Sequence, residues 1–434
     1  MRKIMLVLGV GLLLMSVSFS MEPKVEYHGL FYIYNFMWYN ADFQSSTKDG
    51  DQHYYIHGDF TVDVDFGDGI STHAAFGGWG CFGMHAITGA GPMYGGTPGE
   101  KVALRELYIT VANLFNKPLS FRIGKEHVLY GDQVFDGGED GFMGVKFSYN
   151  TDAIDIDLFS YRLEEGGGTA LIGAMRDSVP SDWNLYGLWS TFKLGEKSTL
   201  SAYGFCRKLG AYHELETWYY PQGTKDSPKW LGLRHEASPI EGLDYVVEFS
   251  KMMGNQEGAS TINYTGMHYM ARLSYTPTGT PFTFGGAYVS FAGDDTATAD
   301  DELYESPTWG PYTFGFYKAW PGFGPAHLLR TGFGFSLLAP WEAMVTNLNV
   351  INFNAQYKKG PLTLRADVFN YSRNMPEAGN AETAMGKEVA LLATYSYKGN
   401  LDVGATIGYW IPGKYFGTGL SPMLGGYFFT AKSF

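Results

Sequence analysis

Charged side chains recur at a spacing of two residues inside stretches that are otherwise apolar or aromatic. Arg365 and Asp367 lie this way in Leu364–Val368, and Arg234 and Glu236 repeat the pattern. Residues two apart in an extended strand point to the same side, so each pair places a cation and a carboxylate on one face. Such a pair either holds an ion or a sugar, or forms a salt bridge that solvates a wall. For any single residue we favour the salt bridge.

A glycine-rich acidic segment, Gly131–Gly141, reads GDQVFDGGEDG and carries Asp132, Asp136, Glu139 and Asp140. Clustered oxygen ligands suit Ca²⁺, although the spacing differs from that of a calcium-binding helix–loop–helix. A second alternative is a loop that folds inward and constricts a passage. A solvated external loop is the third. The sequence leaves the three open.

Catalytic motifs are poorly represented. His213 and His235 are each followed by glutamate, as at the start of a zinc-protease motif, but Thr217 and Pro239 stand where the second histidine belongs. The sequence contains neither a Gly-x-Ser-x-Gly elbow nor a phosphate-binding loop. A serine–histidine pair on an outer wall is not excluded. We expect no enzyme and no resident cofactor.

The elements that must position these residues are strands. In Tyr54–Phe66 apolar and polar residues alternate, with Ile56, Phe60 and Val62 on one face and Asp63 on the other. A period of two with one apolar face is typical of a strand that has lipid on one side and water on the other. Similar runs continue to the end of the chain.

Short turns and long polar connections alternate strictly between these runs, as in outer-membrane β-barrels. Counting the runs predicts an all-β fold, a transmembrane antiparallel barrel of about 18 strands with short periplasmic turns and long extracellular loops. Three of the expected loops are Gly210–Pro228, Met253–Asn263 and Gly293–Met344. Thr331–Leu338 inside the last is an alternative strand, but counting it would make the strand number odd.

The first twenty residues resemble a secretory leader, with Arg2 and Lys3 before an apolar run. We therefore expect a signal peptide over 1–20 and a single barrel domain over 21–434. Aromatics make up 17% of the residues and the mean hydropathy is only -0.14, as expected when every second residue faces water. The net charge of -13, which the loss of two leader cations takes to -15, argues against a nucleic-acid partner. Cys81 and Cys206 are expected to be free thiols.

This architecture predicts a location in the outer membrane of a Gram-negative-type bacterium. The expected partners are outer-membrane lipid, lipopolysaccharide, the barrel-assembly machinery that recognises a C-terminal strand ending in Phe434, and small solutes. For a second acidic cluster, we favour a solvated loop tip, or divalent cations bridging to lipopolysaccharide phosphates, over a dedicated site. That cluster consists of Asp294, Asp295, Asp300, Asp301 and Glu302.

Alternation also predicts which side chains face inward, because a charge at the lipid midplane costs several kcal/mol. The inward basic residues are Arg122, Lys146, Arg234, Arg272 and Arg365. The inward acids are Asp59, Asp63, Asp65, Asp155, Asp157, Glu236, Glu248, Asp367 and Glu388. Val62, Val64, Phe121, Ile123, Val247 and Phe249 should face lipid. For Tyr32, Tyr34, Trp38 and Tyr39 we favour an interfacial girdle over a sugar-stacking slide.

Two blocks of the sequence resemble the alginate-export porin family. The first is LRELYITVANLFNKPLSFRIGKEHVLYGD, Leu104 to Asp132, and the second is GKEVALLATYSYKGNLDVGATIGYWIPGKYF, Gly386 to Phe416. The resemblance implies an 18-stranded porin-like channel whose family exporter passes an acidic polysaccharide through a positively charged lumen. This chain departs from that pattern because its inward charges are mixed and acids outnumber bases. Lys432 also stands where the last strand usually carries an apolar residue.

The sequence thus predicts a channel for diffusion of small polar or charged solutes, with its selectivity set by inward charges and loops. Arg122 and Arg272 are expected to line the pore, and the excess of acids predicts a mild preference for cations. Two alternatives remain: an exporter of an acidic, alginate-like polysaccharide, and a plugged barrel that binds or adheres through its surface loops.

Overall fold

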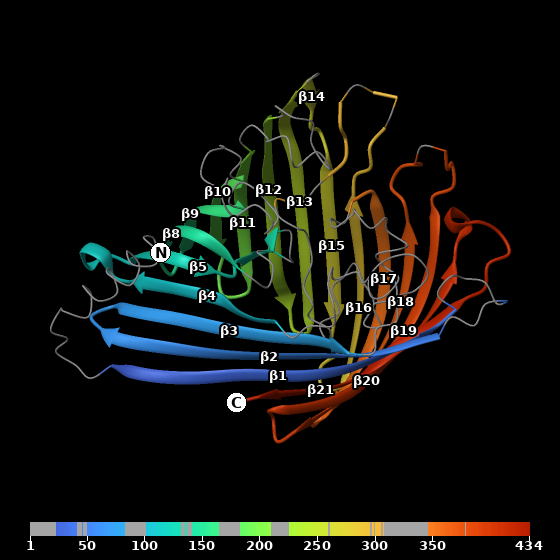
Figure 1. The fold of residues 1–434 in the computed structure, drawn as a ribbon, viewed down its shortest axis with the longest axis horizontal. Helices are drawn as coiled ribbons and strands as arrows, with labels where there is room; N and C mark the ends of the chain where they lie inside the picture. Colours follow the sequence, from blue (N-terminus) through green and yellow to red (C-terminus); the bar gives the residue numbers. More distant parts are fainter. Residues whose placement is uncertain are drawn as a thin grey trace.

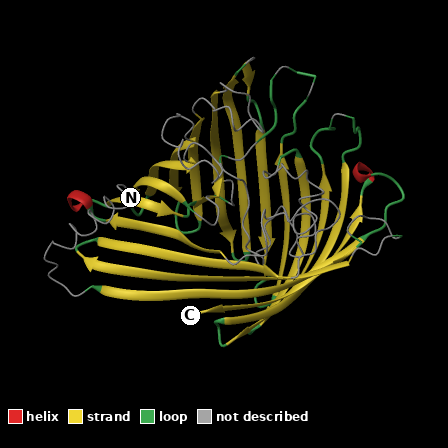
Figure 2. Cartoon of the chain, viewed as in Figure 1, coloured by secondary structure: helices red, strands yellow, loops and turns green. Residues whose placement is uncertain are grey.

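The computed structural model describes residues 23–40, 46, 50–82, 101–131, 135–136, 141–164, 183–209, 225–258, 261–295, 297–298, 300–304, 307, 346–377 and 379–434. Nearly all of this is strand, apart from the single turns η1 (Leu114–Asn116) and η2 (Lys414–Phe416) (Figure 2). Among the residues described, no helix has the length and apolar character needed to cross a membrane.

Eighteen strands form the wall, and each pairs antiparallel with its neighbour along the chain. They are β1 (Lys24–Tyr39), β2 (Gly50–Gly67), β3 (Ile70–Phe82), β4 (Lys101–Val111), β5 (Leu119–Glu126), β8 (Phe142–Asn150), β9 (Ile154–Glu164), β10 (Trp183–Lys193), β11 (Ser198–Leu209), β12 (Lys225–Ile240), β13 (Leu243–Glu257), β15 (Met267–Tyr275), β16 (Phe282–Phe291), β17 (Leu348–Lys359), β18 (Leu362–Ser372), β19 (Ala384–Tyr397), β20 (Leu401–Pro412) and β21 (Met423–Ser433).

The wall closes where β21 pairs with β1, from Leu30 opposite Ser433 to Tyr39 opposite Leu424. In Figure 1 the sheet can be followed from blue β1 through green and orange strands back to red β21. Among the residues that the structure describes, closure leaves none of the 18 wall strands as an edge strand, which is the condition for strands to stand in lipid. The predicted 18-stranded antiparallel barrel is confirmed.

Alternate residues face opposite sides of this wall. Val247 and Phe249 on β13 are 45% and 37% exposed on the outer surface, whereas Glu248 between them is 3% exposed and faces inward. Large apolar side chains such as Leu233 and Phe353 are exposed on the outer face of other strands in the same way. The outer surface is therefore an apolar belt, and the polar residues gather inside.

This arrangement gives a labelling test of the register. Cysteine at position 63 should react with a water-soluble reagent that enters the lumen, and cysteine at position 62 should react with a lipid-phase reagent, because the two side chains point to opposite sides of β2. Labelling of position 63 but not 62 from the lipid phase would contradict the register.

The short turns join strands at one end. In the turn between β2 and β3, Gly67, Asp68 and Gly69 all have positive φ, +79°, +52° and +78°. Glycine adopts this conformation without strain and aspartate tolerates it, which explains why these residues occupy the tight reversal.

Two strands run further than the sequence predicted. β12 begins at Lys225 within the expected loop Gly210–Pro228, and β13 continues to Glu257, where it pairs with the short strand β14 (Thr261–Asn263). The ladder persists between β12 and β13 through this extension. The prediction was wrong here because both faces of the extension are polar, so alternation gives no signal once the strands leave the lipid.

The aromatic residues of β1 also differ from expectation. Tyr32 and Tyr34 lie inside the barrel and are 6% and 0% exposed. The alternate residues Phe31 and Ile33 face outward. Tyr34 packs against Tyr427 of β21. The interfacial-girdle assignment was wrong for this pair, because their place in the two-residue alternation puts them on the lumen side. Tyr39 is exposed, and the side chain of Trp38 lies outside the description.

The closing seam is packed by the last residue. The amide of Phe434 donates to the carbonyl of Gly29 at 3.0 Å, and the reciprocal bond is 2.8 Å. The ring of Phe434 lies directly over Gly29, where a Cβ would come within 2.1 Å of a ring carbon. An aromatic ring over a strand glycine is a known means of fixing register.

We therefore expect Phe434→Ala to lower the yield of inserted barrel several-fold, and Gly29→Val to produce the same defect by displacing the ring. The folded fraction can be read after refolding into lipid vesicles from the heat-modifiable mobility of the barrel on gels. Normal insertion of both variants would contradict a role for this contact.

Candidate functional site: the lumen wall and its inward segment

The predicted lumen residues all stand on the inner side of the alternation, and most are engaged in ion pairs or hydrogen bonds. Asp63 bonds His73 at 2.7 Å, and Lys193 donates to Asp155 at 2.9 Å. Tyr371 donates to Glu388 at 3.4 Å. Many charged side chains of the wall are therefore bound to other wall residues, which agrees with the salt-bridge interpretation of individual charges.

The most connected carboxylate is Glu126 at the end of β5, which is 2% exposed. Arg122 and Lys146, directly opposite each other on β5 and β8, both donate to its Oε2, at 2.6 and 3.0 Å. Tyr161 of β9 donates to its Oε1. The guanidinium of Arg122 also lies 4.2 Å from the ring centre of Tyr108. Glu126 thus offsets two like charges that would otherwise repel across the ladder.

Glu248 on β13 has a similar position further round the wall. Arg234 of β12, its cross-strand partner, donates to it at 3.0 Å and to Glu236 at 3.0 Å. Tyr203 of β11 donates to the other oxygen of Glu248 at 2.9 Å. Glu236 is half exposed to the lumen, whereas Glu248 is enclosed.

A polar hollow of about 400 Å³ opens in the wall from β12 to β18. Arg365 borders it and donates twice to Asp367, both at 2.7 Å, while Asn352 donates to the same carboxylate at 3.2 Å. Arg272 on β15 stands on its other side. The hollow lies where β16 contributes small residues, Thr283, Gly285 and Ala287. The remaining polar lining includes Thr283, Asn354, Gln356, Glu236 and Asp244.

Another inward cluster surrounds Arg105 of β4. Its guanidinium contacts the Nε2 of His57 at 2.8 Å and also pairs with Asp59. The cation stands at a bulge, because the register between β3 and β4 shifts between Ala75 and Phe76. A bulge places consecutive residues on one side, so Glu106 also faces inward and accepts a hydrogen bond from the amide of His127 at 3.0 Å.

The segment that follows β5 folds into the barrel. Val128 and Tyr130 are buried, and Tyr130 donates to Asp157 on the wall at 2.7 Å. Gly131 lies against the carboxylate of Glu248, where a Cβ would be 3.1 Å from both oxygens. Glu248 is six strands further round the wall than β5, so this segment reaches across the lumen and narrows it.

The acidic residues of the expected constriction loop are not placed in the same way. Asp132, Glu139 and Asp140 lie outside the described residues, and for Asp136 only the backbone is described, in β7 (Phe135–Asp136). β7 pairs with β6 (Leu129–Tyr130) as a separate two-stranded unit.

A buried ion pair that alternation did not predict lies near the long-loop end of the wall. Arg207 of β11 and Asp226 of β12 are 1% and 0% exposed and lie 3.1 Å apart. Tyr264 donates to the same carboxylate at 2.8 Å, and the guanidinium lies 5.5 Å from the ring centre of Trp230. Both Asp226 and Tyr264 fall at or beyond the ends of the predicted strands.

The acidic cluster after β16 is organised by its own hydrogen bonds. Thr298 donates to Glu302 at 2.6 Å, which lowers the pKa of that carboxyl group, while partial burial raises the pKa of Asp294. Within the described ranges, no group of three or more histidine, cysteine, aspartate or glutamate residues is arranged to hold a metal ion.

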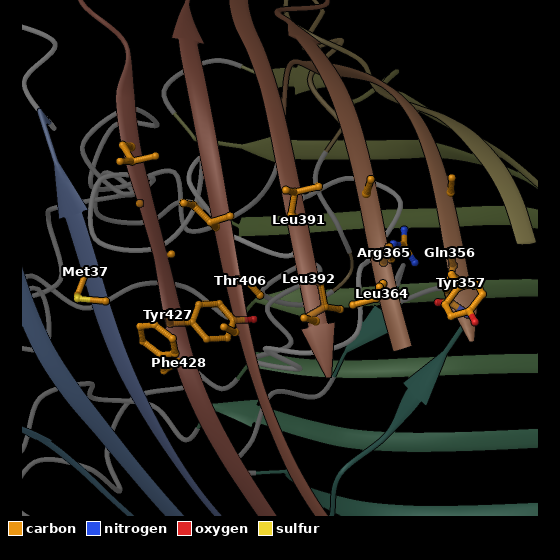
Figure 3. Close-up of a pocket in the computed structure, with 18 of the residues that line it drawn as sticks. Met37, Gln356, Tyr357, Leu364, Arg365, Leu391, Leu392, Thr406, Tyr427 and Phe428 are labelled. Carbon is orange, nitrogen blue, oxygen red and sulfur yellow. The ribbon is translucent and has the colours of Figure 1, made fainter. Parts of the chain in front are cut away.

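The outer wall carries an apolar groove of about 600 Å³ across β17 to β21 and β1 (Figure 3). Large outward residues such as Leu391 and Phe428 flank small ones, including Ala366 and Gly426. Because most of these side chains belong to the outward set, the groove faces the surroundings of the barrel and contributes nothing to a passage through it.

A serine–histidine pair does stand on the outer wall at the short-turn end. Ser198 lies 3.0 Å from Nε2 of His235, and Tyr245 lies 3.0 Å from Nδ1. Acyl transfer also needs free donors for an oxyanion. The amides beside the pair, those of Leu194 and Ser238, are bound to backbone carbonyls. Tyrosine and histidine are ordinary at a membrane interface, so we assign the cluster a structural role.

No protein-family model and no curated protein matches this chain. Among solved structures it resembles Pseudomonas aeruginosa OprD, with 11% identity and a TM-score of 0.53 over 95% of each chain. It also resembles Pseudomonas aeruginosa OpdO, with 11% identity and a TM-score of 0.56 over 95% of this chain and 97% of that one. Acinetobacter baumannii OccAB2 gives 11% and 0.56 over 94% and 98%.

At these identities the likeness concerns the fold. It extends over almost the full length of both chains, and it agrees with the closed antiparallel barrel of 18 strands. The resemblance to the alginate-export family receives no support from these comparisons.

Proposed function

We propose that the protein is an outer-membrane channel through which small polar or charged solutes diffuse. The observation that carries this proposal is the contrast between the two faces of the closed wall. The outer face is an apolar belt, while the inner face carries Arg122, Lys146, Arg234, Arg272 and Arg365 with their partner carboxylates and a polar hollow. A polar interior inside a lipid-facing barrel is the construction of a diffusion pore.

The solved barrels that it resembles are outer-membrane porins from Gram-negative bacteria, which supports the same location and function here. In this proposal residues 1–20 are removed on export and residues 21–434 form the barrel. The protein contacts lipid and lipopolysaccharide and is inserted by the barrel-assembly machinery.

The inward segment favours small solutes over a polymer. Tyr130 and Gly131 stand in the lumen against Asp157 and Glu248, so a bulky chain would have to pass this obstruction. The cations of the wall are paired with carboxylates, as at Glu126 and Asp367, and so present no continuous positive path for a polyanion. The proposal therefore differs from export of an acidic polysaccharide.

Swelling of proteoliposomes in neutral sugars of increasing size tests the proposal against a plugged adhesion barrel. We expect rapid swelling with monosaccharides and a steep fall with larger oligosaccharides, because the inward segment limits the opening. Absence of swelling with every sugar, from protein shown to be folded by its heat-modifiable mobility, would contradict a channel.

A further inference from the structure

Four aromatic side chains form a continuous shelf on the inner wall. They are Phe159 of β9, Trp189 of β10, and Tyr203 and Phe205 of β11. Trp189 and Tyr203 stack with their ring centres 4.7 Å apart at 6°, and Trp189 and Phe205 at 6.4 Å and 19°. We call this set the aromatic shelf.

Two glycines leave room for the rings of the aromatic shelf to lie against the backbone. Gly187 lies beneath Phe159 and Phe205, where a Cβ would come within 2.1 and 2.7 Å of ring carbons. Gly232 lies beneath Tyr203 in the same way, at 2.1 Å. A side chain at either position would collide with these rings, so the two glycines are needed for the close contact between the rings and the backbone.

Tyr130 lies on this shelf but does not belong to the wall. Its ring is 5.0 Å from that of Trp189 at 20° and 5.5 Å from that of Phe159 at 9°, which is stacked geometry on both. Its hydroxyl donates to Asp157 at 2.7 Å. The position of Tyr130 therefore combines two ring faces, those of Trp189 and Phe159, with one strong acceptor, Asp157. A phenol can contact all three at once.

Tyr130 stands outside the ladder that forms the barrel wall. It stands in β6, which pairs only with β7 and is not part of the 18-stranded ladder. Gly131 next to it has a φ of +66°, a conformation that glycine adopts freely. The stacking of the Tyr130 ring and the hydrogen bond of its hydroxyl group are contacts that a solute with the same chemistry can replace.

We propose that the aromatic shelf with Asp157 is a binding subsite for a neutral para-hydroxyaryl group, whose place Tyr130 occupies when no solute is bound. This inference rests on the proposed channel function, because the solute reaches the shelf from the lumen. Asp157 accepts the hydrogen bond of the hydroxyl group, so a carboxylate in the place of that hydroxyl group would be repelled.

The subsite can be tested by calorimetric titration of the full, detergent-solubilised protein with p-cresol, the side-chain analogue of tyrosine. The wild type should bind weakly, because p-cresol must displace Tyr130. Tyr130→Ala should bind about tenfold tighter or more, since the internal competitor is gone. Tyr130→Phe, which keeps the ring but loses the bond to Asp157, should be intermediate and guards against loss of folding in the alanine variant.

The chain offers a matched control. Tyr304 is also supplied by a loop and is fully buried, and the rings that it packs against are those of His268 and Phe291. Tyr304→Ala should leave p-cresol affinity at the wild-type value. In the Tyr130→Ala background, where no internal competitor remains, Asp157→Asn should reduce p-cresol affinity towards that of toluene, which lacks the hydroxyl group. Cyclohexanol should bind more weakly than p-cresol because it lacks the aromatic face.

A p-cresol affinity of Tyr130→Ala no higher than that of the wild type would overturn the proposal, because Tyr130 would then not compete for the subsite. An equal gain in Tyr304→Ala would also overturn it. Ion conductance tests the channel proposal separately. A barrel that conducts no ions but binds p-cresol as expected would contradict the channel proposal and would still support the subsite.

Discussion

Replacing Glu126 with alanine is expected to destabilise the barrel by about 3 kcal/mol, the lower end of the range for breaking a buried ion pair. Arg122 and Lys146 face each other across the ladder and both donate to this one carboxylate. Without it the two cations repel, and the hydroxyl of Tyr161 loses its acceptor. Partial exposure of Arg122 to the lumen keeps the cost at the lower end. Urea-dependent unfolding in lipid vesicles measures the change.

Glu236→Gln is the matched control. Glu236 also binds an arginine, Arg234, but it is half exposed and Arg234 keeps its second carboxylate, Glu248. The control should therefore cost less than about 1 kcal/mol, as exposed pairs do. Equal free energies of unfolding for Glu126→Ala and the wild type would show that the cluster is not coupled as its geometry indicates.

A second large effect is expected at the buried pair of Arg207 and Asp226. Asp226→Ala should cost about 3–5 kcal/mol, because it leaves a guanidinium enclosed without a carboxylate. Replacing both residues by apolar ones, Arg207→Met with Asp226→Leu, should recover most of that loss, because no unpaired charge remains. The stacking of Arg207 on Trp230 and the hydroxyl of Tyr264 account for the remainder.

The same unfolding experiment, arranged as a double-mutant cycle, gives the coupling energy of this pair. A double variant as unstable as Asp226→Ala alone would mean that the loss comes from packing rather than from the uncompensated charge.

The strands were predictable because lipid imposes a simple rule on them. A charge facing the membrane is costly, so the sequence of β13 around Glu248 must alternate, and the alternation reveals both the strand and its faces. The tight turn at Gly67-Asp68-Gly69 was predictable for a similar reason, since few residues adopt positive φ. The number of strands followed from these two signals.

The partners of the inward charges were not predictable to the same degree. Arg365 and Asp367 are two residues apart on one strand, so their contact follows from local geometry. Glu126 meets Lys146 and Tyr161 from other strands, and that contact depends on the registers of two ladders. Local sequence carries little information on register between strands.

The direction of the segment after β5 could not be predicted from the sequence, because apolar and polar residues do not alternate in it. Its glycines suggested a loop, and folding inward was one of three alternatives for Gly131–Gly141. Of that range the structure describes only Gly131, Phe135–Asp136 and Gly141, so the choice among the three alternatives stays a prediction. The residue just before it, Tyr130, is held inward by Phe159 and Trp189, which come from later strands. A contact with residues far along the chain, such as that of Tyr130 with Trp189, produces no periodic pattern in the sequence around Tyr130.

The most direct test of the proposed channel and its charge preference is the reversal potential across a planar bilayer with an asymmetric KCl gradient at low salt. We predict steady single-channel conductance with a mild preference for cations, because inward acids outnumber bases and a narrow low-dielectric passage focuses their field. The preference should fade at high salt as the Debye length shortens. No conductance would contradict the channel, and a clear preference for anions would contradict its charge assignment and favour polyanion export through Arg105, Arg122, Arg272 and Arg365.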